Sequence, residues 1–370
     1  MSPDMLTADT DSEYVVRMFD TGDRSDYLAL YDTVLGTASD EWFTWKYGRN
    51  PYTDHIPIVV ADYDGEIVGA KSMLGMQLKH DETTLSALQP CDTMVHPDHR
   101  FQGLFSRMTE FSKNIYAERD VDLFFNFPNS KTLSGALKHG WEHLQDVPVS
   151  YRIQNPVSCA GVDGGPLGTV AESLSVRVLS AYYDWVDQSV SAPSSFAIDR
   201  RSTVPTAKLG TLYERTVPNR IHTVRDKRYY DWRFDTPKWS YETYLATHDE
   251  AVVAAVVVGT RPGEPTSIAQ LTDVLPLGGC ERSTGVLEAL LQRLLPEYRD
   301  AEMIAVAGDS LPDSVCRTFG FRSDNRQPLA QFTTPTPLVA YPLCPDDSAA
   351  GRGLLDASNW LVTFADMDTR

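Results

Sequence analysis

The chain lacks long hydrophobic runs and a leader-like start, and these absences exclude whole classes of protein. No run of about 18 uncharged apolar residues occurs, so the sequence offers no membrane span. The acidic start MSPDMLTADTDSEYVV lacks the basic and then apolar pattern of a secretory signal. We therefore expect a soluble, cytoplasmic protein with no membrane partner.

Cysteine is scarce, odd in number and not paired along the chain. None of the five cysteines lies in a CxxC motif, so the sequence predicts neither a disulfide framework nor a zinc site. His96 and His99 flank Asp98, but no third and fourth ligand follows at a useful spacing. We expect no metal, and we expect reduced thiols at Cys91, Cys159, Cys280, Cys316 and Cys344.

Lysine is also scarce, whereas acidic residues are plentiful along the whole chain. There are nine Lys against 24 Arg, and 51 acidic residues give a net charge of −18. Such a surface repels nucleic acid, so no nucleic-acid partner is expected. Acidic residues in excess and few lysines suit a halophilic protein, since concentrated salt screens the self-repulsion over a few ångströms.

The 370 residues are enough for two domains, and the sequence contains an internal duplication. Each half has an aromatic segment, EWFTWKYGRNPY or RYYDWRFDTPKWSY, followed by two apolar runs that read as a hairpin. Asp64-Gly65 marks the first hairpin turn, and His248-Asp249-Glu250 marks the second.

The order of elements continues to match after the hairpins. Each half has a strand that holds an acid and ends near a Pro, then an amphipathic helix, an apolar strand, and a short helix that closes on Gly140-Trp141 or Gly320-Phe321. Two copies of one α/β unit are predicted. We assign residues 1–153 to the first domain, 154–175 to a linker, 176–345 to the second domain, and 346–370 to a tail whose end looks like a last strand.

The stretch VHPDHRFQGLF, residues 95–105, joins a strand to a helix and indicates an anion site. The first amides of a helix have no partner within the helix, and the helix dipole makes that end positive. Gly103 lets a bulky anion approach the backbone, and Arg100 adds a permanent charge. A diphosphate suits this chemistry, while neither GxxxxGK[ST] nor GxGxxG occurs at the turn.

These residues resemble motif A of the GNAT N-acyltransferases, V-x-P-x-x-R-x-x-G-[IL]-[GA], which binds the pyrophosphate of acetyl-CoA. The resemblance extends over most of the chain through WKYGRNP, DYDGEIVG and FPNSKTLSGALKHGW. It implies an α/β (α+β) protein of two tandem GNAT-like domains, each with a mixed, mostly antiparallel central sheet flanked by helices.

The same resemblance implies a cofactor site, residue by residue. Met94 and Val95 on the strand would pair with the pantetheine arm, and Asn129 would bond that arm further along. Phe105 stands where Gly or Ala is usual. The pyrophosphate loop would consist of Arg100, Phe101, Gln102, Gly103, Leu104 and Phe105.

Asp92, three residues before Val95, is the candidate catalytic residue. Many GNAT proteins carry an acid there that faces the acceptor, so Asp92 is predicted to be the general base, direct or through water, or to position a cationic amine. A purely structural role is the alternative, because Asp273 occupies a comparable place in the second half.

The proton donor for the leaving thiolate cannot be assigned. The Tyr that family members carry four residues before the helix-closing Gly is Ala136 here, and Cys316 in the second half. Water, Ser130, Ser134 and Tyr116 remain open. The second R-x-x-G, Arg282 to Gly285, lacks the V-x-P lead and is interpreted as a degenerate site.

The sequence therefore predicts an N-acetyltransferase that moves the acetyl group of acetyl-CoA to a primary amine of a small molecule, such as an amino sugar or amino-acid derivative. Two alternatives stay open: a non-catalytic acyl-CoA-binding or scaffold protein, and an aminoacyl-tRNA-dependent transferase of the same fold. The lack of a basic stripe disfavours the latter.

Overall fold

The structure is a computed structural model of the 370-residue chain. It describes residues 13–155, 166–190, 193, 195–262, 268–279, 283–327, 329–331, 333–344, 351 and 353–368, with the side chains of 166–176 left out. Arg282, part of the R-x-x-G predicted to be degenerate, lies outside these residues, as do Cys159 and Cys280.

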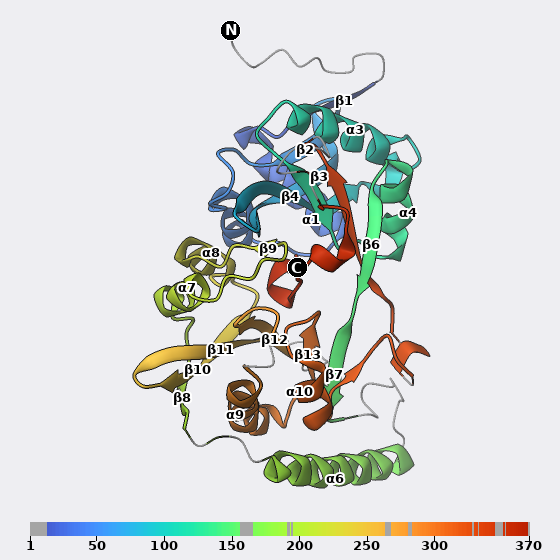
Figure 1. The fold of residues 1–370 in the computed structure, drawn as a ribbon. Helices are drawn as coiled ribbons and strands as arrows, with labels where there is room; N and C mark the ends of the chain where they lie inside the picture. Colours follow the sequence, from blue (N-terminus) through green and yellow to red (C-terminus); the bar gives the residue numbers. More distant parts are fainter. Residues whose placement is uncertain are drawn as a thin grey trace. The chain divides into compact units, whose positions relative to one another are not determined.

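The chain forms two compact units, and neither is one continuous segment (Figure 1). Unit 1 comprises residues 1–145, 337–360 and 368–370, and unit 2 comprises 146–336 and 361–367. The predicted ranges differ from these units at both ends of the second half. Residues 146–153 belong to unit 2, and residues 337–345 belong to unit 1, because strands at these places complete the sheets described below.

Unit 1 is built on a sheet with the strand order β1-β2-β3-β4-β5-β15-β6. Its neighbours pair antiparallel from β1 to β4, β4 and β5 run parallel, and β5 pairs antiparallel with β15. The strands are β1 (Tyr14–Met18), β2 (Ile58–Tyr63), β3 (Glu66–His80), β4 (Thr83–Val95), β5 (Leu123–Asn126), β15 (Thr336–Pro342) and β6 (Glu142–Val147).

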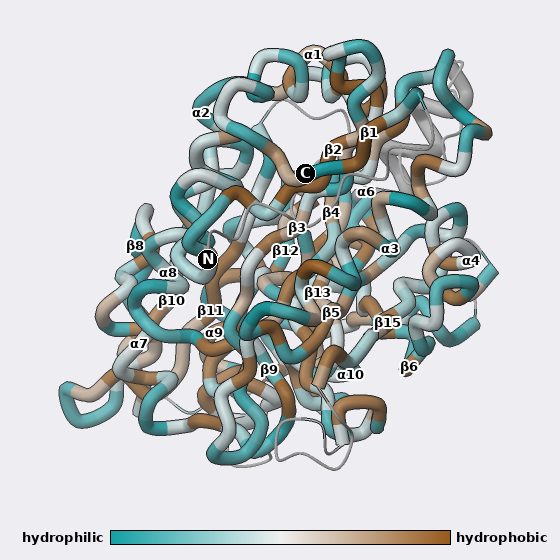
Figure 2. Tube along the Cα trace, turned by 90° about the horizontal axis from the view of Figure 1, so that it is seen from above, coloured by the Kyte–Doolittle hydropathy of each residue, from teal (hydrophilic) through white to brown (hydrophobic). Residues whose placement is uncertain are grey.

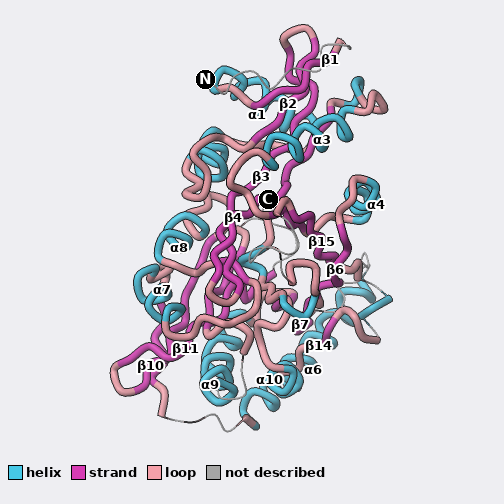
Figure 3. Tube along the Cα trace, turned by 45° about the horizontal axis from the view of Figure 1, so that its top comes forward, coloured by secondary structure: helices cyan, strands magenta, loops and turns pink. Residues whose placement is uncertain are grey.

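Helices cover this sheet, as Figure 3 shows for α3 beside the magenta strands. Helix α3 packs against β1 to β4, and α1 packs against β3 and β4. Apolar residues of α3 such as Met108 lie in the core against Val59 and Ala61 of β2. The helical elements are η1 (Thr21–Asp23), α1 (Arg24–Val34), α2 (Asp40–Phe43), the π-helical turn η2 (Thr44–Gly48), η3 (Pro97–His99), α3 (Leu104–Ala117) and α4 (Ser130–Lys138).

Unit 2 repeats the plan with a sheet of order β14-β7-β13-β12-β11-β10-β8. Only β12 and β13 run parallel among its paired strands. Hydrophobic residues line β11 and β13, drawn brown in Figure 2. The strands of this sheet are β7 (Val149–Ile153), β8 (Ala197–Arg201), β10 (Ser240–His248), β11 (Ala251–Thr260), β12 (Ile268–Leu275), β13 (Met303–Ala307) and β14 (Arg322–Ser323), and the two-residue strand β9 (His222–Thr223) lies outside it.

The core of unit 2 forms where α9 lies on this sheet. Leu287, Leu290, Leu291 and Leu294 of α9, spaced by three and four residues, are fully buried in it. The helical elements of unit 2 are α6 (Pro166–Ser189), α7 (Thr206–Glu214), α8 (Lys227–Arg233), α9 (Thr284–Leu294), η5 (Leu295–Tyr298), α10 (Asp313–Thr318), η6 (Leu329–Gln331) and η8 (Phe364–Asp366), whereas η7 (Ala357–Asn359) belongs to unit 1.

The predicted duplication and fold class are confirmed. In each unit a hairpin is followed by a strand, a helix, a parallel strand and a short helix: β2 to α4 in unit 1, and β10 to α10 in unit 2. The turn residues Asp64 and Gly65 have φ of 52° and 84°, as a two-residue hairpin turn requires. Gly140 and Gly320, with φ of 82° and 76°, end the closing helices.

Two predictions about connecting segments are corrected. Helix α6 begins at Pro166, inside the predicted linker, because proline is well suited to the first turn of a helix. The end of the tail forms no strand among its described residues up to Asp368. The Asp356 and Thr363 side chains instead accept backbone N–H groups and start the 3-10 turns η7 and η8, which compete with sheet pairing.

No helix among the described residues is both long enough and apolar enough to cross a membrane.

Candidate functional site

The predicted pyrophosphate loop is a tight turn between β4 and α3. Phe101 and Gly103 have left-handed backbone, with φ of 65° and 74°. Phe101 is not a glycine, so its left-handed backbone is strained. Its side chain is fully exposed, so no packing of that side chain offsets the strain. Strain of this kind concentrates at ligand-binding turns. Arg100 is exposed, and its Nε donates to the Val95 carbonyl at 3.3 Å.

The start of α3 is open. Gly103 is the N-cap residue, so no side chain caps the helix, and a Cβ placed on Gly103 would meet no atom within 4 Å. The amides of Leu104 and Phe105 therefore keep their hydrogen-bonding capacity at the positive end of a 14-residue helix. Such an end can bind a phosphate group.

The strand before this turn runs past its parallel neighbour. Among the described residues, β5 pairs with β4 only at Ala87↔Leu123 and Leu88↔Phe124, while β4 continues to Val95. The end of β4, with Met94 and Val95, is thus left without β5 at its side. An extended amide-containing ligand can pair with a strand edge of this kind.

Asn129, the third predicted cofactor contact, lies where β5 leads into α4. It is the N-cap of α4, and its Oδ1 accepts from the amides of Lys131 and Thr132 at 3.0 and 3.1 Å. The Asn129 side chain is exposed, and its amide nitrogen is the group that could donate to a ligand. The first turn of α3 is close to the middle of α4, since a Cβ on Gly135 would meet the Phe105 ring at 3.0 Å.

A β-bulge distorts β4 at the candidate catalytic residue. Ala70 pairs with Met94 and Ser72 with Cys91, so Asp92 and Thr93 together oppose the single residue Lys71 of β3. Asp92 has φ of 39°, the left-handed region that aspartate enters more readily than most residues. Bulges redirect side chains and are frequent beside active sites.

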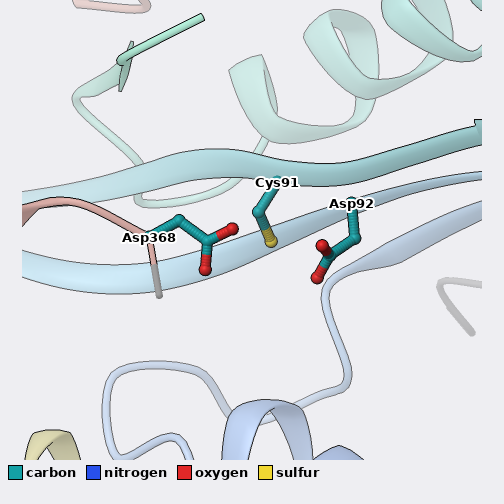
Figure 4. Close-up of side chains that lie close together, drawn as sticks. All are labelled: Cys91, Asp92 and Asp368. Carbon is teal, nitrogen blue, oxygen red and sulfur yellow. The ribbon is translucent and has the colours of Figure 1, made fainter. Parts of the chain in front are cut away.

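The Asp92 side chain is fully buried and belongs to a charged cluster. Its Oδ2 accepts from Lys46 Nζ at 2.5 Å and from the Tyr47 hydroxyl at 2.7 Å. Lys46 Nζ also lies 2.7 Å from Asp368 Oδ1. Figure 4 shows Cys91, Asp92 and Asp368 converging, with Asp368 on the C-terminal segment.

Charge balance within this cluster is set by burial and by the two carboxylates. Burial acts to lower the pKa of the Lys46 ammonium, but the charges of Asp368 and Asp92 outweigh it and hold that pKa well above its ordinary value. Burial raises the pKa of the Cys91 thiol, against the opposing charge of Lys46. Lys46 is therefore a fixed cation and Cys91 a neutral thiol near pH 7.

Cys91, Asp92 and Asp368 also have the geometry of metal ligands, because one ligand atom from each lies within 4.8 Å of the others. The Lys46 ammonium already lies at hydrogen-bonding distance from both carboxylates. A lysine in that place supplies the positive charge that a metal ion would bring, so the group is explained as an ion-pair cluster.

Unit 2 contains a counterpart of this cluster without the motif turn. Asp273 of β12 accepts from the Tyr230 hydroxyl at 2.8 Å and pairs with Arg225 at 3.3 Å. Arg225 Nη2 also bonds Asp366 Oδ1 at 2.9 Å. Both strands thus bury an aspartate against a tyrosine and a cation, so the arrangement also occurs where the motif turn is absent.

The side chains left open as proton donors differ in their surroundings. Tyr116 is buried, its hydroxyl lies 2.9 Å from His55 Nε2, and burial raises its pKa above the ordinary value. Ser130 and Ser134 are exposed on α4. Ala136, half-buried beside Leu133 in the core of unit 1, has no proton to give.

Two lysines of unit 1 were missed at the sequence level. Lys46 lies in the quoted WKYGRNP, but only the fold brings it to Asp92. Lys71 interrupts the apolar run IVGAKSMLGM, and a lysine in such a run is the one signal that could have marked it. Its side chain is 6% exposed, and burial lowers its pKa to about 8.

Comparisons with known proteins agree with this architecture. The family described as "Acetyltransferase (GNAT) domain" matches residues 15–144. No curated protein sequence matches the chain.

Solved structures match over most of the chain at low identity, and so show its fold. A GCN5-related N-acetyltransferase from Anabaena variabilis is 9% identical with a TM-score of 0.60, over 90% of this chain and 73% of that one. A probable N-acyltransferase from Enterococcus faecalis is 9% identical with a TM-score of 0.60, over 89% of this chain and 72% of that one.

A third similar structure has nearly the same length as this chain. It is a tandem GNAT protein from the clavulanic acid biosynthesis pathway, 12% identical with a TM-score of 0.51, over 90% of this chain and 99% of that one. Residues 15–144 therefore match a GNAT acetyltransferase domain, and the chain as a whole has the fold of tandem GNAT proteins.

Proposed function

We propose that this protein is an acetyl-CoA-dependent N-acetyltransferase whose acceptor is a primary amine of a small molecule, such as an amino sugar or an amino-acid derivative. The observation that carries the proposal is the turn from Arg100 to Phe105. It leads into a helix whose first amides have no side-chain cap, and the space over Gly103 is empty.

In this proposal the pyrophosphate of acetyl-CoA binds the amides from Phe101 to Phe105, with Arg100 as its counter-charge. The pantetheine arm pairs with Met94 and Val95 along the part of β4 that extends beyond its pairing with β5. The Asn129 amide nitrogen donates to the same arm. The donor's thioester then lies toward the bulge at Asp92, where the strand edge ends.

Acetyl transfer needs a group that acts on the acceptor amine, and we propose Asp92 for that part. Lys46 and Tyr47 already contact its Oδ2, so Asp92 acts through this hydrogen-bonded cluster, as a relay for the amine proton or as an anchor of a cationic amine. Unit 2, whose R-x-x-G lacks the V-x-P lead, would bind no acetyl-CoA.

The proposal also includes a halophilic, cytoplasmic setting. It rests on the net charge of −18 and the nine lysines and on the cytosolic supply of acetyl-CoA that such an enzyme needs.

Two measurements on the full-length protein test the proposed function. Acetyl-CoA should raise the melting temperature, because a ligand that binds only the folded state stabilises it. Release of free CoA should accelerate when amines from a panel of amino sugars and amino-acid derivatives are added. Stabilisation without release by any amine would favour the acyl-CoA-binding alternative.

No stabilisation by acetyl-CoA would overturn the proposal. An aminoacyl-tRNA-dependent transferase would then become the better candidate, and transfer from a charged tRNA would be the assay.

A further inference from the structure

Lys71 is a titratable group of the bulge region to which the proposed reaction assigns no role. It lies in the middle of β3, between β2 and β4 in the sheet of unit 1, and opposes the bulge residues Asp92 and Thr93. Its exposed fraction is 6%. A lysine buried to that extent ordinarily has a carboxylate or several oxygen acceptors around its ammonium.

Lys71 has no such partner among the residues that the structure describes. No hydrogen bond or ion pair to its ammonium is formed within them. Its Nζ lies over the Phe105 ring, 5.3 Å from the ring centroid. A cation over an aromatic face gains far less than it loses by leaving water, so the ammonium has unused donors.

The neighbourhood of Lys71 belongs to the donor site. Phe105 is the second residue of α3 and a member of the proposed pyrophosphate loop. The Phe105 ring is also close to α4, because a Cβ on Gly135 would meet the ring at 3.0 Å. The Lys71 ammonium therefore lies beside the start of α3, close to α4 and to the bulge in β4.

We propose that Lys71 is the general acid of this acyltransferase and protonates the sulfur of CoA as the thioester breaks. The role rests on the proposed function, since it requires acetyl-CoA with its pantetheine arm along β4. The thioester sulfur would supply the acceptor that the Lys71 ammonium lacks.

The amine nitrogen of the acceptor bonds to the thioester carbonyl carbon and passes its proton toward Asp92 and its cluster. The carbon–sulfur bond breaks, the sulfur keeps the electron pair, and the Lys71 ammonium transfers one proton to it. Products are the amide and the CoA thiol; the Asp92 cluster then releases the amine proton to water, and neutral Lys71 takes up a proton from water.

The electrostatic surroundings suit this task. Burial lowers the pKa of Lys71 to about 8. On the α3 and α4 side, the His139 ring lies 5.9 Å from the Phe105 ring and is hydrogen-bonded to the Glu110 carboxylate. An acid with a pKa near that of a thiol loses and regains its proton readily.

The test compares the pH dependence of kcat for the wild-type protein, Lys71→Met and Lys71→Arg. Wild-type kcat should fall as the pH rises through about 8, the pKa of the proposed acid. Lys71→Met should lower kcat at pH 7 by about 100-fold and remove that limb. Lys71→Arg keeps the charge but does not release a proton, so its kcat should be equally low with acetyl-CoA affinity retained.

Lys79→Met is the matched control, because Lys79 lies on the same strand but outside the bulge. It should keep the wild-type kcat and pH profile. Unchanged kcat and an unchanged basic limb in Lys71→Met would overturn the role of Lys71 while leaving the proposed function in place.

A second readout needs no acceptor amine. Bound CoA should have a thiol pKa about one unit lower in the wild-type protein than in Lys71→Met, measured by the ultraviolet absorbance of the thiolate. Equal thiol pKa values would contradict the proposal. If CoA and acetyl-CoA bind neither protein, the proposed function fails, and the role of Lys71 fails with it.

Discussion

Lys71 places an ammonium group in the core of unit 1 without a counter-charge among the described residues, and its cost to stability can be measured. A folded-state pKa of about 8 against 10.5 corresponds to about 3 kcal/mol. Because the folded state disfavours the charged form, the cost is fully present below pH 8 and is relieved as the pH rises from about 8 to above 10.5.

Lys71→Met should therefore be more stable than the wild-type protein. Urea unfolding at pH 7 should give a gain of about 3 kcal/mol at most, and the gain should shrink at pH 10. A loss of stability at pH 7 would show that Lys71 is a structural group. A more stable but less active variant is the pattern expected of a functional residue.

A comparison of Asp92 with Asp273 separates a catalytic role of the buried aspartate from a structural one. Both are buried and paired with a tyrosine and a cation, but only Asp92 stands before the motif turn. Asp92→Asn and Asp273→Asn should each cost about 3 kcal/mol, because each leaves a buried cation under-compensated. Only Asp92→Asn should lower kcat, with acetyl-CoA affinity nearly unchanged.

Steady-state kinetics on both variants, at a temperature where both are folded, checks this expectation. Equal kcat values for Asp92→Asn and the wild-type protein would remove Asp92 from the mechanism. Equal losses in both variants would point to a general effect of instability.

Single residues of the site were predictable only where a local pattern carries them. Arg100 and Gly103 follow from their spacing between a strand and a helix. The partners of Asp92 do not, since Lys46 lies 46 residues away and Asp368 comes from the other end of the chain. Lys71 opposes Asp92 only because of the register of β3 against β4, which the extra residue of the bulge in β4 shifts.

At the scale of elements, the turn before α3 makes the most specific prediction. Gly103 has φ of 74°, a conformation that Asn and Asp tolerate, and its surroundings leave room for a side chain. Gly103→Asp places a negative charge at the helix end that would hold the pyrophosphate, and should weaken acetyl-CoA binding by about 100-fold. Gly103→Asn, with the same shape and no charge, should bind more tightly than Gly103→Asp.

Titration calorimetry with acetyl-CoA compares the two variants under one salt concentration. Similar affinities for Gly103→Asp and Gly103→Asn would show that no anion lies at this turn. A drop in the melting temperature of Gly103→Asp alone would not count as support, because aspartate at a helix N-terminus is itself stabilising.

Elements were predictable where residue periodicity and turn chemistry agree. The hairpin at Asp64-Gly65 and the apolar spacing of α3 and α9 are of this kind. The strand predicted at the end of the tail was wrong. NWLVTF is apolar enough for a strand, but the Thr363 and Asp366 side chains form a capping box with the backbone and start a 3-10 turn instead. Side-chain capping bonds override a short apolar run.

For the whole molecule, the duplication was visible in the sequence but the extent of each unit was not. Strand β7 precedes the second copy and pairs in its sheet, and β15 pairs with β5 of the first copy. Both pairings join strands that are far apart in the sequence, so neither composition nor periodicity predicts them. A sheet edge accepts any strand of suitable register, which only the folded chain selects.

The net charge of −18 makes a prediction about salt. Repulsion among surface carboxylates extends about 10 Å at 0.1 M salt and about 3 Å at 1 M, so screening should stabilise the fold. The melting temperature should rise steeply from 0.1 to 1 M KCl and less beyond it. A flat or falling curve would contradict a halophilic origin, and sucrose at matched osmolarity controls for exclusion effects.

The stoichiometry of acetyl-CoA binding to the full-length chain tests the central claim most directly. Calorimetric titration should give one site per chain, strongly weakened in Gly103→Asp and unchanged in Lys79→Met. Two equivalent sites would show that unit 2 also binds the donor. No binding at any salt concentration would contradict the assignment of the turn from Arg100 to Phe105 as an acetyl-CoA site.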